Sequence, residues 1–146
     1  MDLTQSISYN LTKTGNLLQQ LTAHRMKSLG IDLTPEESVF MHQLWDRDSQ
    51  SQAELNLWSI KGASTVTRQI DKLVSKGYVE RRNGEADRRT VTISLTSKGK
   101  ALQKHFEKTN IAGLDDEFLP LSTQERAALL ALLTDAREKI MAEIAR

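Results

Sequence analysis

The segment from residue 51 to residue 96 constrains the fold most, because its hydrophobic period changes there from helical to strand-like. Ser51 and Glu54 have the spacing of a capping box, which predicts a short helix with Leu55, Leu57, Trp58 and Ile60 as its apolar residues. After the KGAS break, apolar residues at intervals of three and four predict a second helix over residues 64–76, followed by a glycine. Two short helices joined by a tight turn form a helix-turn-helix.

A β-hairpin is predicted directly after this pair of helices. Val91, Ile93 and Leu95 alternate with polar residues, and the Asn83-Gly84 dipeptide is a strong turn signal. A hairpin that follows a helix-turn-helix is a wing. Four arginines surround its tip, namely Arg81, Arg82, Arg88 and Arg89.

The flanking sequence is predicted to be helical. Thr34 and Pro35 give a strong helix start, and Ser122 with Glu125 forms a second capping box before the last helix. We therefore expect a mainly α fold with a small β-hairpin wing. It comprises one domain over residues 1–146, with a winged helix-turn-helix lobe over 34–96 and helical dimerisation regions over 1–30 and 97–146. The dimer is expected because the last helix has an apolar stripe that so short a chain cannot cover: Leu129, Leu133, Ala136, Ile140 and Ile144.

The charge of the chain is concentrated in its middle. The whole chain has a formal charge of +1, but residues 61–100 contain ten basic and four acidic side chains, a net charge of +6. Such a region fits a nucleic-acid footprint, although a solvated charged face is the alternative. The chain has no cysteine, which excludes disulfides and thiolate chemistry, and no apolar run long enough to cross a bilayer. We expect a cytoplasmic protein without a membrane partner.

The second helix of the pair has a polar face opposite its apolar stripe. On a helical wheel this face carries Ser64, Arg68 and Lys72, with Thr65 beside them. Arginine matches guanine O6 and N7 in a major groove, while hydroxyls and lysine suit phosphates. The alternative is an exposed amphipathic helix with polar filler.

The wing arginines have a different task in this interpretation. A hairpin tip too small to bury anything fits a minor groove, whose negative potential attracts arginine. Asp87 is unexpected near phosphates unless it orients a guanidinium through a charge-assisted hydrogen bond. The alternative is a hairpin whose charges only keep it soluble.

The segment SQAELNLWSIKGASTVTRQIDKLVSKGYVERRNGEADRRTVTISLTSKGKAL resembles the winged-helix core of the MarR family of bacterial transcription regulators. The similarity includes the STVTR start of the recognition helix, the D-x-R element of the wing and the LTSKG opening of the next helix; SIKGA replaces the usual glycine-then-isoleucine turn. The resemblance implies an obligate homodimer in which each winged helix takes one half-site, with Arg89 in the minor groove and Asp87 orienting it. The expected DNA-binding residues are Ser64, Thr65, Thr67, Arg68, Lys72, Arg82, Asp87, Arg88 and Arg89.

No catalytic site, metal site or cofactor is predicted. The three histidines are scattered, and the sequence contains neither a paired metal-ligand spacing nor a Gly-rich phosphate loop. Members of the MarR family commonly bind small phenolic or other aromatic acids between the DNA-binding lobe and the dimer helices. His24, His42 and Trp45 are the candidates for such a site, and core packing is the alternative for Trp45.

These observations predict a sequence-specific transcription regulator, a ligand-responsive repressor that binds a pseudo-palindromic double-stranded DNA operator as a homodimer. Two other classes remain open: an architectural DNA-binding protein without a defined operator, and a winged-helix module for protein interaction. The mixture of hydroxyls and arginine on the recognition face favours base readout, since phosphate binding alone would be served by lysines.

Overall fold

The computed structural model describes residues 1–83, 89–108 and 113–146. The chain divides into two compact units, Met1–Ile111 and Ala112–Arg146. Most described residues are helical, and a small antiparallel sheet lies in the first unit. The predicted fold class, mainly α with a β-hairpin wing, is confirmed.

The first unit begins with helices whose ends follow the sequence signals. A 3-10 helix over Leu3–Gln5 precedes α1 (Ile7–Ser28), and α2 spans Pro35–Asp46. The hydroxyl of Thr34 accepts a hydrogen bond from the Glu37 N–H at 3.1 Å, so the predicted N-cap is confirmed.

The helix-turn-helix consists of α3 (Gln52–Asn56), a 3-10 turn over Ala63–Thr65 and α4 (Val66–Ser75). Ser51 and Glu54 form the predicted capping box in both directions. Only Leu55 of the apolar residues predicted for the first of these helices reaches the core. The helix ends at Asn56, and Leu57, Trp58 and Ile60 are exposed.

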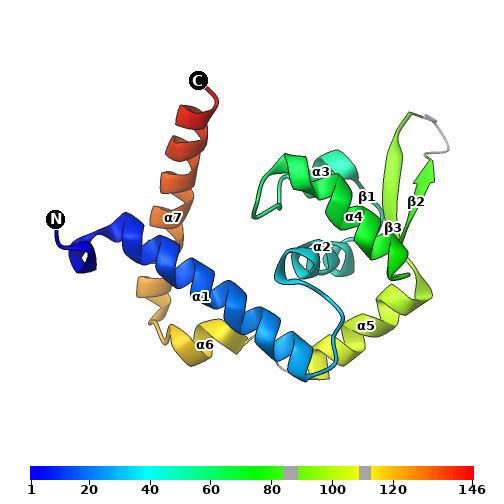
Figure 1. Ribbon diagram of the computed structural model, residues 1–146, viewed down its shortest axis with the longest axis horizontal. Helices are drawn as coiled ribbons and strands as arrows, with labels where there is room; N and C mark the ends of the chain where they lie inside the picture. The colour runs from blue at the N-terminus through cyan, green and yellow to red at the C-terminus, as the bar shows by residue number, and fades with distance from the viewer. Residues whose placement is uncertain (84–88, 109–112) are drawn as a thin grey trace. The chain divides into compact units, whose positions relative to one another are not determined.

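The sheet has three antiparallel strands in the order β1-β3-β2. β1 covers Gln50–Ser51, β2 covers Val79–Asn83 and β3 covers Val91–Leu95. Figure 1 shows β2 and β3 extending as a wing beside α4. The two-residue strand β1 was not predicted; it pairs Gln50 with Ile93 and so attaches the wing to the start of α3.

The core of this unit is formed by α2, α3, α4 and the sheet. Its side chains from α2 are Phe40, Met41 and Leu44, and those from the wing strands include Val79 and Ile93. Helix α5 (Ser97–Lys108) adds Phe106 to the same cluster. The helix-turn-helix, the sheet and α5 therefore share one hydrophobic cluster.

Helix α5 begins against the start of the wing. Gly99 lies in the first turn of α5, its N–H donates to the hydroxyl of Thr96, and its carbonyl accepts from the Trp45 indole at 3.0 Å. A Cβ at this position would collide with the Tyr78 carbonyl oxygen and lie 3.3 Å from Leu95 Cδ2. The junction between wing and helix therefore requires glycine.

The second unit contains α6 (Leu114–Phe118) and α7 (Thr123–Ile144). Ser122 and Glu125 form the predicted capping box at the start of α7. None of the described helices combines the length and the apolar character needed to span a membrane.

We expect Gly99→Ala to lower the free energy of unfolding by about 1 to 3 kcal/mol, the usual cost of forcing a methyl group into a packed site. Gly15→Ala is the matched control, because a Cβ there meets no described atom within 4 Å and alanine favours the interior of α1 by about 0.5 to 1 kcal/mol. Urea unfolding at one protein concentration compares the two variants. Equal effects of the two substitutions would contradict the proposed close approach.

A second prediction concerns pH. His42 packs edge to face against Trp45 and Phe106, with ring centroids 5.2 and 4.9 Å away. Although the residue as a whole stays exposed, its imidazole is partly desolvated, and this lowers the pKa of the imidazole. Between the lowered folded pKa and the ordinary value of 6.5, the unfolded chain binds more protons than the folded one, so stability rises with pH and falls on acidification through this window. His42→Phe keeps an aromatic ring without a titrating group. The unfolding free energy of the His42→Phe variant should fall less between pH 7.5 and pH 5 than that of the parent. An identical fall in both proteins would show that His42 does not cause the loss of stability on acidification.

Candidate DNA interface

The orientation of α4 is set by its buried face. Val66, Ile70 and Leu73 are fully buried, and α4 packs against α2 and α3 (Figure 1). A helix fixed along one side must present the opposite side to solvent. Arg68 and Lys72 lie on that opposite, exposed side, as the sequence predicted.

The turn between the two helices depends on Gly62. Its φ is 94°, a conformation in which a side chain is strained. The Gly62 carbonyl accepts from the hydroxyls of Ser59 at 3.0 Å and Thr65 at 3.1 Å. The unusual SIKGA sequence thus still forms a helix-turn-helix, with its glycine at the sharp bend.

The hydroxyl-bearing candidates at the start of α4 differ in their surroundings. Ser64 is exposed in the 3-10 turn, whereas Thr65 is half-buried and its hydroxyl donates a hydrogen bond to the Gly62 carbonyl. Thr67 is exposed and accepts a 2.7 Å hydrogen bond from the amide of Gln52, the first residue of α3. Gln52 was not selected from the sequence, because its contact with a residue 15 positions away depends on how the helices pack.

Two basic side chains on α4 are available to an external partner. Within residues 1–83, 89–108 and 113–146, neither Arg68 nor Lys72 makes an ion pair. Both are exposed. They lie one helical turn apart, so α4 offers two uncompensated positive charges along a single face.

The wing arginines are divided between the two faces of β2. Arg82 is paired with Glu80 of the same strand, with its Nε 2.7 Å from the carboxylate. Arg81 instead reaches Asp71 on α4, at 2.6 Å. Arg89 is exposed, while Asp87 and Arg88 lie outside the described residues.

The direction of Arg81 follows from strand register. Arg81 is opposite Ile93, which is fully buried, so the two side chains share the face of the sheet that packs on α4. The resulting ion pair neutralises Asp71, the acidic residue within α4. Arg81 therefore supports the recognition helix and is not presented at the tip of the wing.

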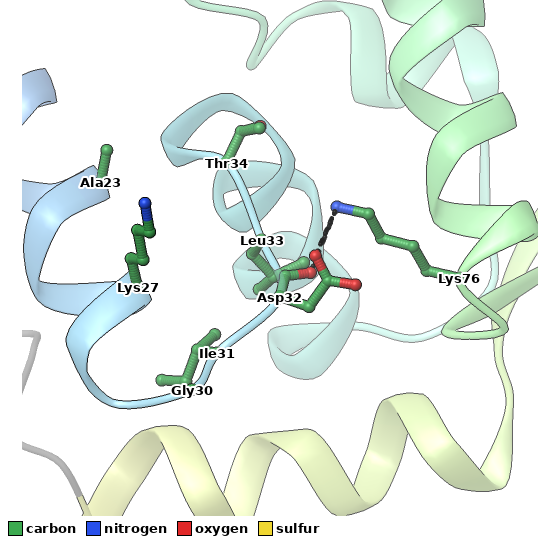
Figure 2. A pocket seen from close by; sticks show the side chains of 8 residues that line it. All are labelled: Ala23, Lys27, Gly30, Ile31, Asp32, Leu33, Thr34 and Lys76. Carbon is green, nitrogen blue, oxygen red and sulfur yellow. Dashed lines mark hydrogen bonds and ion pairs between the residues drawn. The ribbon is translucent and has the colours of Figure 1, made fainter.

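The C-terminal end of α4 is held by Lys76. Its Nζ lies 2.8 Å from Glu37, which is almost fully buried in α2, and 3.3 Å from Asp32. Burial by itself would lower the pKa of Lys76, but the two carboxylates outweigh it and raise the pKa. Figure 2 shows Lys76 extending toward Asp32 across a hollow that Lys27 of α1 also lines.

The candidate effector residues are only partly brought together. His42 and Trp45 pack with Phe106, which the sequence analysis did not select, and Trp45 also donates to Gly99. His24 is exposed on α1, and no hydrogen bond or ring contact among the described residues joins it to the other two. The hollow at Lys27 and Lys76 is lined by none of these three candidates.

Comparison with known proteins agrees with this architecture. Residues 26–106 match the model of a family described as transcriptional regulator SarA/Rot. The HTH-type transcriptional regulator PecS of Dickeya dadantii is 37% identical over 70 residues, which are 48% of this chain and 42% of PecS. The chain spans less than two thirds of the length of the curated relatives that it matches.

Solved structures share the fold. BpsR of Bordetella bronchiseptica, described in a study of how 6-hydroxynicotinic acid regulates its DNA binding, superposes with a TM-score of 0.78 at 20% identity, covering 94% of this chain and 96% of BpsR. A MarR-family transcriptional regulator from Silicibacter pomeroyi has a TM-score of 0.72 at 24% identity, covering 94% and 92%.

The matched family consists of regulators, which confirms the prediction of a protein that is not an enzyme. The matched residues include α2, α3, α4 and the wing, the elements that build the exposed basic face. The chain belongs to the SarA/Rot family of transcriptional regulators, and its fold is the winged helix-turn-helix of MarR-family proteins.

Proposed function

We propose that the protein is a sequence-specific DNA-binding transcription regulator that inserts α4 into the major groove and its wing into the minor groove. The observation that carries this proposal is the exposed face of α4, where Arg68 and Lys72 have no ion-pair partner among the described residues. A face that binds phosphates or base edges must keep its cations available to the DNA, and Arg68 and Lys72 meet this requirement.

The wing contributes positive charge beside this face. Arg82 and Glu80 form an exposed pair, which is worth little in water and exchanges readily for a phosphate. Arg89 is exposed on the approach to the tip. The roles predicted for Asp87 and Arg88 rest on the sequence alone.

The functional form is proposed to be a homodimer on a pseudo-palindromic operator. Helix α7 has no fully buried residue, and Leu132, Ile140 and Met141 are each more than half exposed. Helix α1 likewise exposes Ile7 and Leu17. A monomer rarely leaves so many large apolar side chains in water, so a second copy of the chain is the natural cover for both helices.

Regulation by a small aromatic acid is proposed by analogy. DNA binding by BpsR, which shares this fold, is regulated by 6-hydroxynicotinic acid. The cluster of His42 and Trp45, together with His24, remains the candidate effector site, and the protein is proposed to act as a repressor that leaves its promoter when the effector binds.

Selection of bound sequences from a random pool of double-stranded DNA tests the function and the assembly together. A regulator that binds as a dimer should select an inverted repeat with half-sites about one helical turn apart, since the two-fold axis of the protein is matched by that of the DNA. A single unrepeated half-site would contradict the dimer. Retention of DNA without a motif would favour the architectural alternative, and no retention would favour the protein-interaction module.

The different contacts proposed for Arg68 and Lys72, to a base edge and to a phosphate, give a separate prediction. Arg68→Ala should weaken binding to the selected operator by about 1 to 3 kcal/mol and binding to random DNA by less, because a base-edge contact is lost. Lys72→Ala should weaken both alike and reduce the salt dependence, because a phosphate contact is lost. Fluorescence anisotropy at several salt concentrations measures both effects. Equal losses on the two DNAs for Arg68→Ala would make Arg68 a phosphate contact.

A further inference from the structure

The side chains of Gln52 and Thr67 link the two helices of the helix-turn-helix near their N-terminal ends. The Gln52 amide nitrogen donates to the Thr67 hydroxyl oxygen at 2.7 Å. Gln52 is the first residue of α3 and Thr67 the second residue of α4. Both helices are anchored nearby, by Leu55 on α3 and Val66 on α4, which are fully buried. The contact is therefore held in place from both sides.

This hydrogen bond assigns a role to the threonine hydroxyl. A hydroxyl has one proton to donate and two lone pairs to accept with. Because the Gln52 amide occupies a lone pair, the Thr67 proton is left for a different acceptor. Thr67 is exposed, and no hydrogen bond to another described residue uses that proton.

The Gln52 side chain has unused capacity as well. An amide nitrogen carries two protons, and only one points at Thr67. No other described residue accepts the second one. The O–H donor of Thr67 and the second N–H donor of Gln52 thus lie close together, and Thr67 directly precedes the exposed Arg68 in α4. Neighbouring donors beside a cation match an anionic acceptor with several oxygens.

We propose that Gln52 and Thr67 act as one unit that contacts a single DNA phosphate, with the threonine hydroxyl as donor to a non-bridging oxygen and Gln52 as the residue that positions it. This inference rests on the proposed DNA-binding function. A phosphate is the expected partner, and a base edge is not, because of where the two helices lie on DNA. In a helix-turn-helix the first helix crosses the backbone, while the second enters the groove. The contact fixes where α4 sits along the DNA and carries no sequence preference of its own.

Four variants test the unit. Thr67→Val removes the hydroxyl at constant shape, Thr67→Ser retains it, Gln52→Met removes the amide at similar length, and the fourth variant combines Thr67→Val with Gln52→Met. We expect Thr67→Val and Gln52→Met each to weaken binding to the selected operator and to random DNA alike, by roughly threefold to tenfold, the effect of one net hydrogen bond. Thr67→Ser should bind like the parent. The double variant should be hardly weaker than either single variant, because coupled residues are not additive.

Anisotropy titrations against both DNAs provide the dissociation constants, with circular dichroism melting as the folding control. Parent-like binding by Thr67→Val, losses that multiply in the double variant, or a loss confined to the operator would each overturn the inference. A merely structural link between the helices would lower the melting temperature of Gln52→Met and leave the binding of the folded protein unchanged, which also overturns it. If the parent binds no DNA, the proposed function itself fails; if the parent binds and Thr67→Val is unaffected, only the phosphate contact fails.

Discussion

The burial of one face of α4 is the constraint on which the rest of the interface depends. Val66, Ile70 and Leu73 are fully buried against a core to which α2, α3 and both long wing strands contribute. Each of these side chains packs against several elements at once. Burial of their apolar surface stabilises the fold by roughly 25 cal/mol per Å² removed from water. Because the helix cannot rotate without exposing this stripe, the direction of Arg68 and Lys72 is determined by residues that never meet DNA.

Ion pairs then decide which of the many cations around α4 remain available. Lys61 pairs with Glu36 at 3.0 Å, Lys76 with Glu37, and Arg81 with Asp71. Each of these pairs ties α4, or a segment next to it, to a neighbouring element. The charge of +6 over residues 61–100 therefore overstates what a DNA backbone would experience locally. Arg68 and Lys72, on the exposed face of α4, are among the cations that no ion pair between described residues neutralises, as groove recognition requires.

Local sequence signals predicted much of this architecture. The caps at Thr34, Ser51 and Ser122 and the apolar stripe of α4 depend on residues a few positions apart, and the structure contains each of them. The features that were missed depend on residues distant in sequence. Strand β1 is only two residues long and exists because Gln50 pairs with Ile93, and the Gln52 contact requires the packed arrangement of two helices. The apolar side chains of Leu57 and Trp58 suggested core positions, but the helix ends before these residues and leaves them exposed to solvent.

The two arginines of β2, Arg81 and Arg82, show how strand register separates support from recognition. Arg81 and Arg82 are neighbours in sequence and identical in chemistry, yet successive side chains of a strand point to opposite faces. Arg81 shares the face of the buried Ile93 and pairs with Asp71, so withdrawing it would leave an uncompensated carboxylate beside the cations of α4. Arg82 pairs with Glu80 in the open, and an exposed pair of this kind holds its members by only about 0 to 1 kcal/mol. Moving Arg82 onto a phosphate therefore costs little, whereas moving Arg81 would weaken the recognition helix that the wing assists. The number of arginines around the hairpin does not show which of them supports α4 and which is available to DNA. That difference depends on which residue of β3 lies opposite each arginine.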